Sequence, residues 1–159
     1  MNADYRKHQT NLLFSGIAII AFGIWSAFKL TIYMRTNDMV MMERLGLADM
    51  VSGDSRAAFI VVGVAVILIS MFVHLFIGIS AIRDTRGKTK VRAYIPVSVL
   101  YICFIIVSYI SVVFTGHMEG FYGNLLVSFI IDLTSFIALV IIIQSSQELK
   151  MLRKKQANA

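Results

Sequence analysis

The sequence predicts an all-α membrane protein in which four transmembrane helices form a bundle, with both the N-terminus and the C-terminus in the cytoplasm. Composition is the first observation behind this prediction. Of the 159 residues, 58% are hydrophobic and 15% are charged, whereas soluble domains are about 45–50% apolar and about 25% charged. The second observation is that the hydrophobic residues are gathered into four blocks. These blocks are residues 12–33, 57–82, 93–115 and 121–143.

Each block is long enough to cross a bilayer as a helix. About 20 helical residues span the ~30 Å hydrocarbon layer, whereas barrel strands need only about 10 residues of alternating polarity. The first block follows Arg6 and Lys7 and contains the small-x-small sequence Ala21-Phe22-Gly23, as a cleaved signal peptide would, but its apolar run continues to Ile32. We therefore expect a retained helix. Residues 1–159 are predicted to form one membrane domain.

Basic residues predict the orientation of these helices. The loop 83–92 holds five of them beside one acid, Asp84, and the tail 144–159 holds four, whereas the turn GHMEGFYG between the third and fourth blocks holds none. Because Lys and Arg in short loops stay in the cytoplasm, the loop, the tail and both termini are predicted to be cytoplasmic. We expect the tail to continue the fourth helix, and anionic lipid head groups, rather than nucleic acid, to be the partner of these basic residues. The residues are Arg83, Arg86, Lys88, Lys90, Arg92, Lys150, Arg153, Lys154 and Lys155.

The connection 34–56 is then on the outer side of the membrane. Its segment MVMMERLGLADMV mixes apolar residues with a few charges at loosely helical spacing. This spacing predicts a short helix that lies on the outer leaflet, or an extension of the first helix. We expect the segment to cover the outer end of the bundle, and a surface that docks a partner is the alternative.

Polar and small residues lie on one face of each predicted span. In the fourth block Asn124, Ser128, Asp132 and Ser135 are spaced by four, four and three residues, which places them on one side of a helix. Lipid provides no hydrophobic drive for helices to associate. Helices in a membrane therefore associate through hydrogen bonds of about 0.6 kcal/mol each and through close contacts of small residues. The polar faces are therefore predicted to point into the bundle. Supporting polar residues in the other spans are Ser70, Tyr101 and Ser108.

Three ionisable residues inside the spans are the candidates for ion coupling: Lys29, His74 and Asp132. A charge at mid-membrane costs about 2.5–3.5 kcal/mol, so such a group finds a partner or water. Lys29 either pairs with Asp132 or extends to the outer head groups. His74 and Asp132 either form a pair that takes up and releases protons, because imidazole titrates near neutral pH, or form a hydrogen bond that only fixes the register of two helices.

Other chemistry is not supported by the sequence. The single cysteine, Cys103, excludes an internal disulfide, a CxxC redox pair and a thiolate metal cluster. The chain has no glycine-rich phosphate loop and no HExxH motif. His117 and Glu119 in the turn after the third block are too few to form a metal site. We therefore expect no catalytic residues, no metal and no cofactor.

These observations predict a small multi-pass protein of the plasma membrane, an accessory subunit or a self-associating scaffold without a catalytic site. Its expected partners are the lipid bilayer and either another membrane protein or a second copy of the chain. Short loops and the lack of glycosylation sequons are typical of the bacterial inner membrane. The alternative is a small proton- or ion-coupled transporter or channel that uses Asp132 and His74, and the third hypothesis is a membrane-embedded enzyme.

Overall fold

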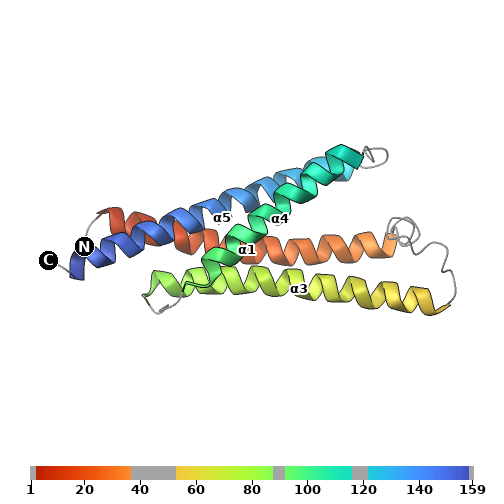
Figure 1. The fold of residues 1–159 in the computed structure, drawn as a ribbon, viewed down its shortest axis with the longest axis horizontal. Coiled ribbons are helices and arrows are strands. Elements are labelled where there is room, and N and C mark those ends of the chain that lie inside the picture. Colours follow the sequence, from red (N-terminus) through yellow and green to blue (C-terminus); the bar gives the residue numbers. More distant parts are fainter. Residues whose placement is uncertain (1–2, 37–52, 88–91, 116–121, 158–159) are drawn as a thin grey trace. The chain divides into compact units, whose positions relative to one another are not determined.

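The protein is all-helical throughout the residues that its computed structural model describes, which are 3–36, 53–87, 92–115 and 122–157. Figure 1 shows the four helices of these ranges: α1 (Ala3–Thr36), α3 (Gly53–Thr85), α4 (Tyr94–Thr115) and α5 (Tyr122–Ala157). The predicted all-α class is confirmed. The segment 39–51, in which a short helix is expected, lies outside the described residues.

Three of these helices are long and apolar enough to cross a membrane. The stretches are Ala3–Ile32, Ile60–Thr85 and Phe129–Gln156, while the apolar part described for α4, Tyr94–Ile110, is shorter. A helix suits lipid because it satisfies its own backbone hydrogen bonds. The prediction of a membrane protein is confirmed to this extent. The crossing by a fourth helix and the orientation of the termini stay predictions.

The chain divides into two compact units, and α1 and α3 run through both of them. Unit 1 contains Met1–Phe22 and Leu75–Ala159, and unit 2 contains Gly23–His74. The core of unit 1 is built from apolar side chains of all four helices, as expected where helices pack through one face. Its buried members are Leu12, Ile19, Ile77, Ala81, Tyr94, Ala138, Leu139, Ile142 and Leu149.

Glycines bring α1 and α3 together within each unit. In unit 1 a Cβ atom on Gly78 would lie 2.6 Å from the carbonyl oxygen of Gly16. In unit 2 a Cβ atom on Gly23 would lie 2.4 Å from the Cβ atom of His74. These distances leave no room for a side chain. The two helices therefore associate through close backbone approach at small residues, which is how membrane helices commonly pack.

Local sequence determines where α3 ends and α4 begins. Gly87 has a φ of 70°, a conformation that favours glycine, and its N–H donates to the carbonyl oxygen of Asp84 at 3.0 Å. This is the usual C-cap of a helix. Pro96 stands in the first turn of α4, where its missing N–H costs no helical hydrogen bond. Asp84 near the end of α3 and Tyr94 at the start of α4 are therefore only ten residues apart in the chain.

Candidate functional site: a buried carboxylate between two arginines

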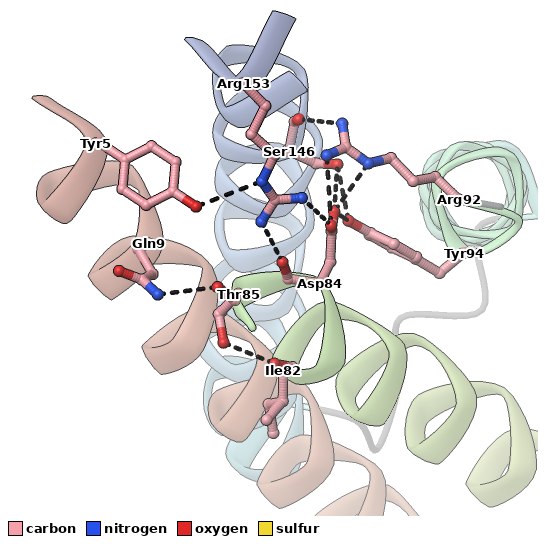
Figure 2. Close-up of polar contacts among 9 residues, drawn as sticks. All are labelled: Tyr5, Gln9, Ile82, Asp84, Thr85, Arg92, Tyr94, Ser146 and Arg153. Carbon is pink, nitrogen blue, oxygen red and sulfur yellow. Dashed lines mark hydrogen bonds and ion pairs between the residues drawn. The ribbon is translucent and has the colours of Figure 1, made fainter. Parts of the chain in front are cut away.

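Asp84, in the last turn of α3, carries a carboxylate that is completely buried, with 0% of its side chain exposed. Arg92 Nε lies 2.9 Å from Asp84 Oδ2, and Arg153 Nη1 lies 2.9 Å from Asp84 Oδ1. Figure 2 shows the two guanidinium groups on either side of the carboxylate. Each oxygen therefore has its own cation, as a buried charge requires.

Two buried hydroxyl groups complete the surroundings of this carboxylate. The Tyr94 hydroxyl donates to Asp84 Oδ2 at 2.6 Å. Ser146 Oγ lies 2.7 Å from the Tyr94 hydroxyl oxygen and 3.3 Å from Asp84 Oδ2. Because a hydroxyl has one proton and bonds to a charged acceptor are the stronger ones, the Tyr94 proton belongs to the carboxylate. We call Asp84, Arg92, Tyr94, Ser146 and Arg153 the Asp84 cluster.

Backbone carbonyl groups hold the two arginines in place. Arg92 Nη1 donates to the carbonyl oxygen of Ser146 at 2.5 Å, which connects the start of α4 to α5. Arg153 Nη2 donates to the carbonyl oxygen of Asp84 at 2.6 Å, which connects α5 to the end of α3. Planar guanidinium groups suit such multiple bonds. The Asp84 cluster thus fastens α3, α4 and α5 to one another.

The N-terminal part of α1 reaches the same end of unit 1. Arg153 Nε donates to the Tyr5 hydroxyl oxygen at 3.4 Å, and Gln9 Nε2 donates to the carbonyl oxygen of Thr85 at 2.8 Å. The Thr85 hydroxyl itself donates to the carbonyl oxygen of Ile82 at 2.7 Å. These contacts, drawn in Figure 2, join the first turns of α1 to the last turn of α3 and to α5. All four helices therefore contribute to one polar network.

The Asp84 cluster combines two positive charges with one negative charge. Arg92 and Arg153 keep 14% and 26% of their side chains exposed. The carboxylate is saturated with donors, so it has no free acceptor position for a substrate. Removing one partner of a buried ion pair costs about 3–5 kcal/mol. The arrangement is therefore suited to holding helix ends together, and only the outer edges of the arginines are available to an external group.

Asp132, the carboxylate singled out in the fourth span, has a different environment in unit 1. The Tyr109 hydroxyl of α4 donates to Asp132 Oδ2 at 2.6 Å. The Tyr109 ring also packs edge to face against Phe129, with ring centroids 5.7 Å apart. The Tyr109 partner was not predicted. Asp132 therefore has a neutral donor on the neighbouring helix, and its side chain is partly exposed.

His74 and Lys29 belong to unit 2, so their predicted pairings with Asp132 stay predictions. His74 is buried, with 1% of its surface exposed, and its Nδ1 lies 2.7 Å from the carbonyl oxygen of Ser70, one turn earlier in α3. Lys29 is exposed on α1.

The remaining predicted residues fall into four groups. Ser135 is buried, whereas Ser70, Tyr101 and Ser108 are partly exposed. Arg92 and Arg153 contact Asp84, and their contact with lipid head groups is an untested prediction like that of the other basic residues. The exposed basic residues are Arg83, Arg86, Lys150, Lys154 and Lys155. Lys88 and Lys90, together with the side chains of Asn124 and Ser128, lie outside the described part of the chain.

The Asp84 cluster was not predicted, although the sequence contains a signal for part of it. The spacing of four and three residues that places Ser135 on the inner face of α5 continues through Leu139 and Ile142 to Ser146, Leu149 and Arg153. All of these side chains are buried except that of Arg153, which is partly exposed. Extending the polar face beyond the predicted membrane boundary would have placed Ser146 and Arg153 on it.

Comparison with protein-family models, with curated proteins and with solved structures found no match for this chain.

Replacing Asp84 with asparagine should destabilise the protein. The neutral amide would leave two guanidinium groups in a partly buried site without their anion, so we expect a loss of about 3–5 kcal/mol in the free energy of unfolding. Reversible denaturant unfolding in detergent, followed by circular dichroism, measures this loss. Asp4→Asn is the matched control, because Asp4 is exposed in the first turn of α1 and should change stability by only about 0.3–1 kcal/mol. Equal effects of the two substitutions would show that the Asp84 pairing does not stabilise the fold.

Proposed function

We propose that this chain is a four-span protein of the plasma membrane, of the bacterial inner-membrane type, with the Asp84 cluster on the cytoplasmic side. The distribution of charge in unit 1 supports this orientation. Where α1 and α4 begin and α3 and α5 end, the described residues include nine Lys and Arg but three Asp and Glu. An excess of basic residues near span ends is typical of the cytoplasmic side. The basic residues are Arg6, Lys7, Arg83, Arg86, Arg92, Lys150, Arg153, Lys154 and Lys155; the acids are Asp4, Asp84 and Glu148.

Thiol labelling of intact cells tests this orientation. Lys155 lies in the last turn of α5, which is cytoplasmic in the proposed orientation. The thiol of Lys155→Cys, in a Cys103→Ser background, should therefore not react with a membrane-impermeant maleimide until the cells are permeabilised. The Cys103→Ser protein alone provides the unlabelled baseline. Labelling before permeabilisation would place the C-terminus outside.

For the role of the protein, an accessory subunit or self-associating scaffold agrees best with the geometry. The observation that carries this proposal is the use of the Asp84 cluster: its carboxylate bonds to groups of the same chain and has no position left for a substrate. The cluster thereby makes one rigid end from four helices. Much apolar surface remains for other membrane components, since only 11% of the most apolar stretch of α3 is buried by the described part of the chain. Contact of this face with a second copy or another membrane protein would use close packing, which drives helix association in lipid.

Purification in a mild detergent, with light scattering to give the mass of the protein part, tests the scaffold proposal. We expect a homo-oligomer or a complex with a stoichiometric partner. Leu68→Trp should weaken this association because Leu68 is 60% exposed on α3 and the larger side chain disturbs close packing. Leu100→Trp on α4, where Leu100 is 72% exposed, is the matched control and should leave association intact. An inert monomer would contradict the proposal.

Proton- or ion-coupled transport is the second candidate, and the bond from Tyr109 to Asp132 favours it. This bond places a carboxylate and a phenol on two adjacent helices within apolar segments. Ionisable groups at such positions in membrane proteins commonly mark ion pathways. Either His74 or Lys29 would then be the expected further member of the pathway.

Flux measurements in proteoliposomes test the transport candidate. Asp132→Asn should abolish proton or cation flux, because the amide cannot exchange a proton or carry the charge, and Tyr109→Phe should reduce flux by removing the donor. Ser108→Ala, next to Tyr109 in the chain, is the control and should retain flux. Absence of flux in the unaltered protein at every pH and with every cation gradient would eliminate this candidate.

A further inference from the structure

We propose that the two arginines of the Asp84 cluster also form a binding site for a terminal phosphate group. This inference concerns a ligand of the cytoplasmic end and does not depend on whether the protein is a scaffold or a transporter. It begins from the charge of the cluster, in which one carboxylate faces two guanidinium groups. A surplus of one positive charge in a largely buried site favours a bound anion, because partial burial weakens screening by salt.

The two arginines also have N–H groups that donate to no described residue. A guanidinium group has five N–H donors. Among the described residues, Arg92 uses three of them, toward both oxygens of Asp84 and the Ser146 carbonyl oxygen. Arg153 likewise uses three, toward Tyr5 and the side chain and carbonyl oxygen of Asp84. Two N–H groups therefore remain on each arginine, and phosphate is an acceptor that matches the planar geometry of this donor set.

Gly87 faces one edge of the Arg153 guanidinium group. A Cβ atom at Gly87 would lie 4.0 Å from both Cζ and Nη2 of Arg153, so this glycine places no side chain against that edge. Arg153 is also the more exposed of the two arginines. Because Asp84 and the backbone hold both guanidinium groups in place before any ligand arrives, little entropy is lost when an anion binds. The site is therefore preorganised.

A terminal phosphate fits better than a phosphate that is esterified on both sides. It has three unesterified oxygens that accept hydrogen bonds and more negative charge, whereas a phosphodiester has two such oxygens. The exposed Arg83 and Arg86 at the end of α3 add positive charge close to the cluster. The ligand is either a lipid whose head group is a phosphate monoester or a soluble phosphate, and the two sources share this chemistry.

Titration of the full chain in a non-ionic detergent tests the proposal. The probes are short-chain phosphatidic acid, short-chain phosphatidylglycerol and inorganic phosphate, with the shift of the thermal unfolding midpoint and native mass spectrometry as readouts. We expect phosphatidic acid to bind at one site, about tenfold or more tightly than phosphatidylglycerol. Inorganic phosphate that binds as tightly, with the same dependence on Arg153, would support the site and identify a soluble ligand.

Arg153→Gln should weaken the binding of phosphatidic acid by about tenfold or more. This variant retains the ion pair of Asp84 with Arg92 and the bond from Tyr94, so the carboxylate keeps a cation. If Arg153→Gln does not fold, Arg153→Lys decides, because lysine keeps the charge but cannot offer the planar fork. Arg6→Gln is the matched control: it removes the same charge from an exposed position on α1 and should leave binding unchanged.

Two results would overturn the proposal. One is equal binding of phosphatidic acid and phosphatidylglycerol, which indicates general attraction to a basic surface. The other is an equal loss of binding in Arg6→Gln and the tested Arg153 variant. Either result would leave the scaffold proposal intact, because that proposal is measured by the association state of the protein.

Discussion

The interaction on which unit 1 depends is the pairing of one buried carboxylate with two guanidinium groups. A charge without access to water is stable only where other charges and hydrogen bonds replace its hydration. Asp84 obtains these from the start of α4 and from α5, and Arg153 adds the first turns of α1 through Tyr5. The interactions that stabilise the Asp84 carboxylate therefore connect segments of four helices. Apolar packing around Leu12, Leu139 and Leu149 then fills the space between the same helices.

The geometry of this pairing follows from local features of the chain. The Gly87 cap ends α3 directly after Asp84, and the first turn of α4 begins at Tyr94, so the carboxylate, Arg92 and the phenol are close in sequence as well as in space. Ser146 and Arg153 are seven residues apart on α5, which places them two turns apart on one face of that helix. The end of α3, the start of α4 and Arg92 between them thus provide three members of the Asp84 cluster, and a single face of α5 provides the other two.

The fold class could be predicted from the sequence because the signals for it are local. The side-chain pairings of Asp84 with Arg92 and Arg153 could not be predicted in this way. Hydrophobic blocks indicate where hydrocarbon surrounds a helix, but they do not show where the helix ends: α1 begins at Ala3, well before block 12–33. The expected continuation of the fourth helix into the tail extends to Ala157 in α5, but the pairing partners along it were not predicted. Stopping at the block boundaries assigned Arg92 and Arg153 to lipid alone and treated Asp84 as one acid among basic residues. The contact of Arg153 with Asp84 joins residues 69 positions apart, and charge signs cannot identify one such partner among several candidates.

Asp84 and Asp132, two carboxylates of unit 1, have partners of different charge. Replacing Asp84 with a neutral side chain would leave two guanidinium groups without their anion. Asp132 is bonded to a phenol instead, and a neutral carboxyl group can still exchange a hydrogen bond with that phenol, because a hydroxyl both donates and accepts. Loss of the Asp132 charge therefore leaves no unpaired cation at Tyr109.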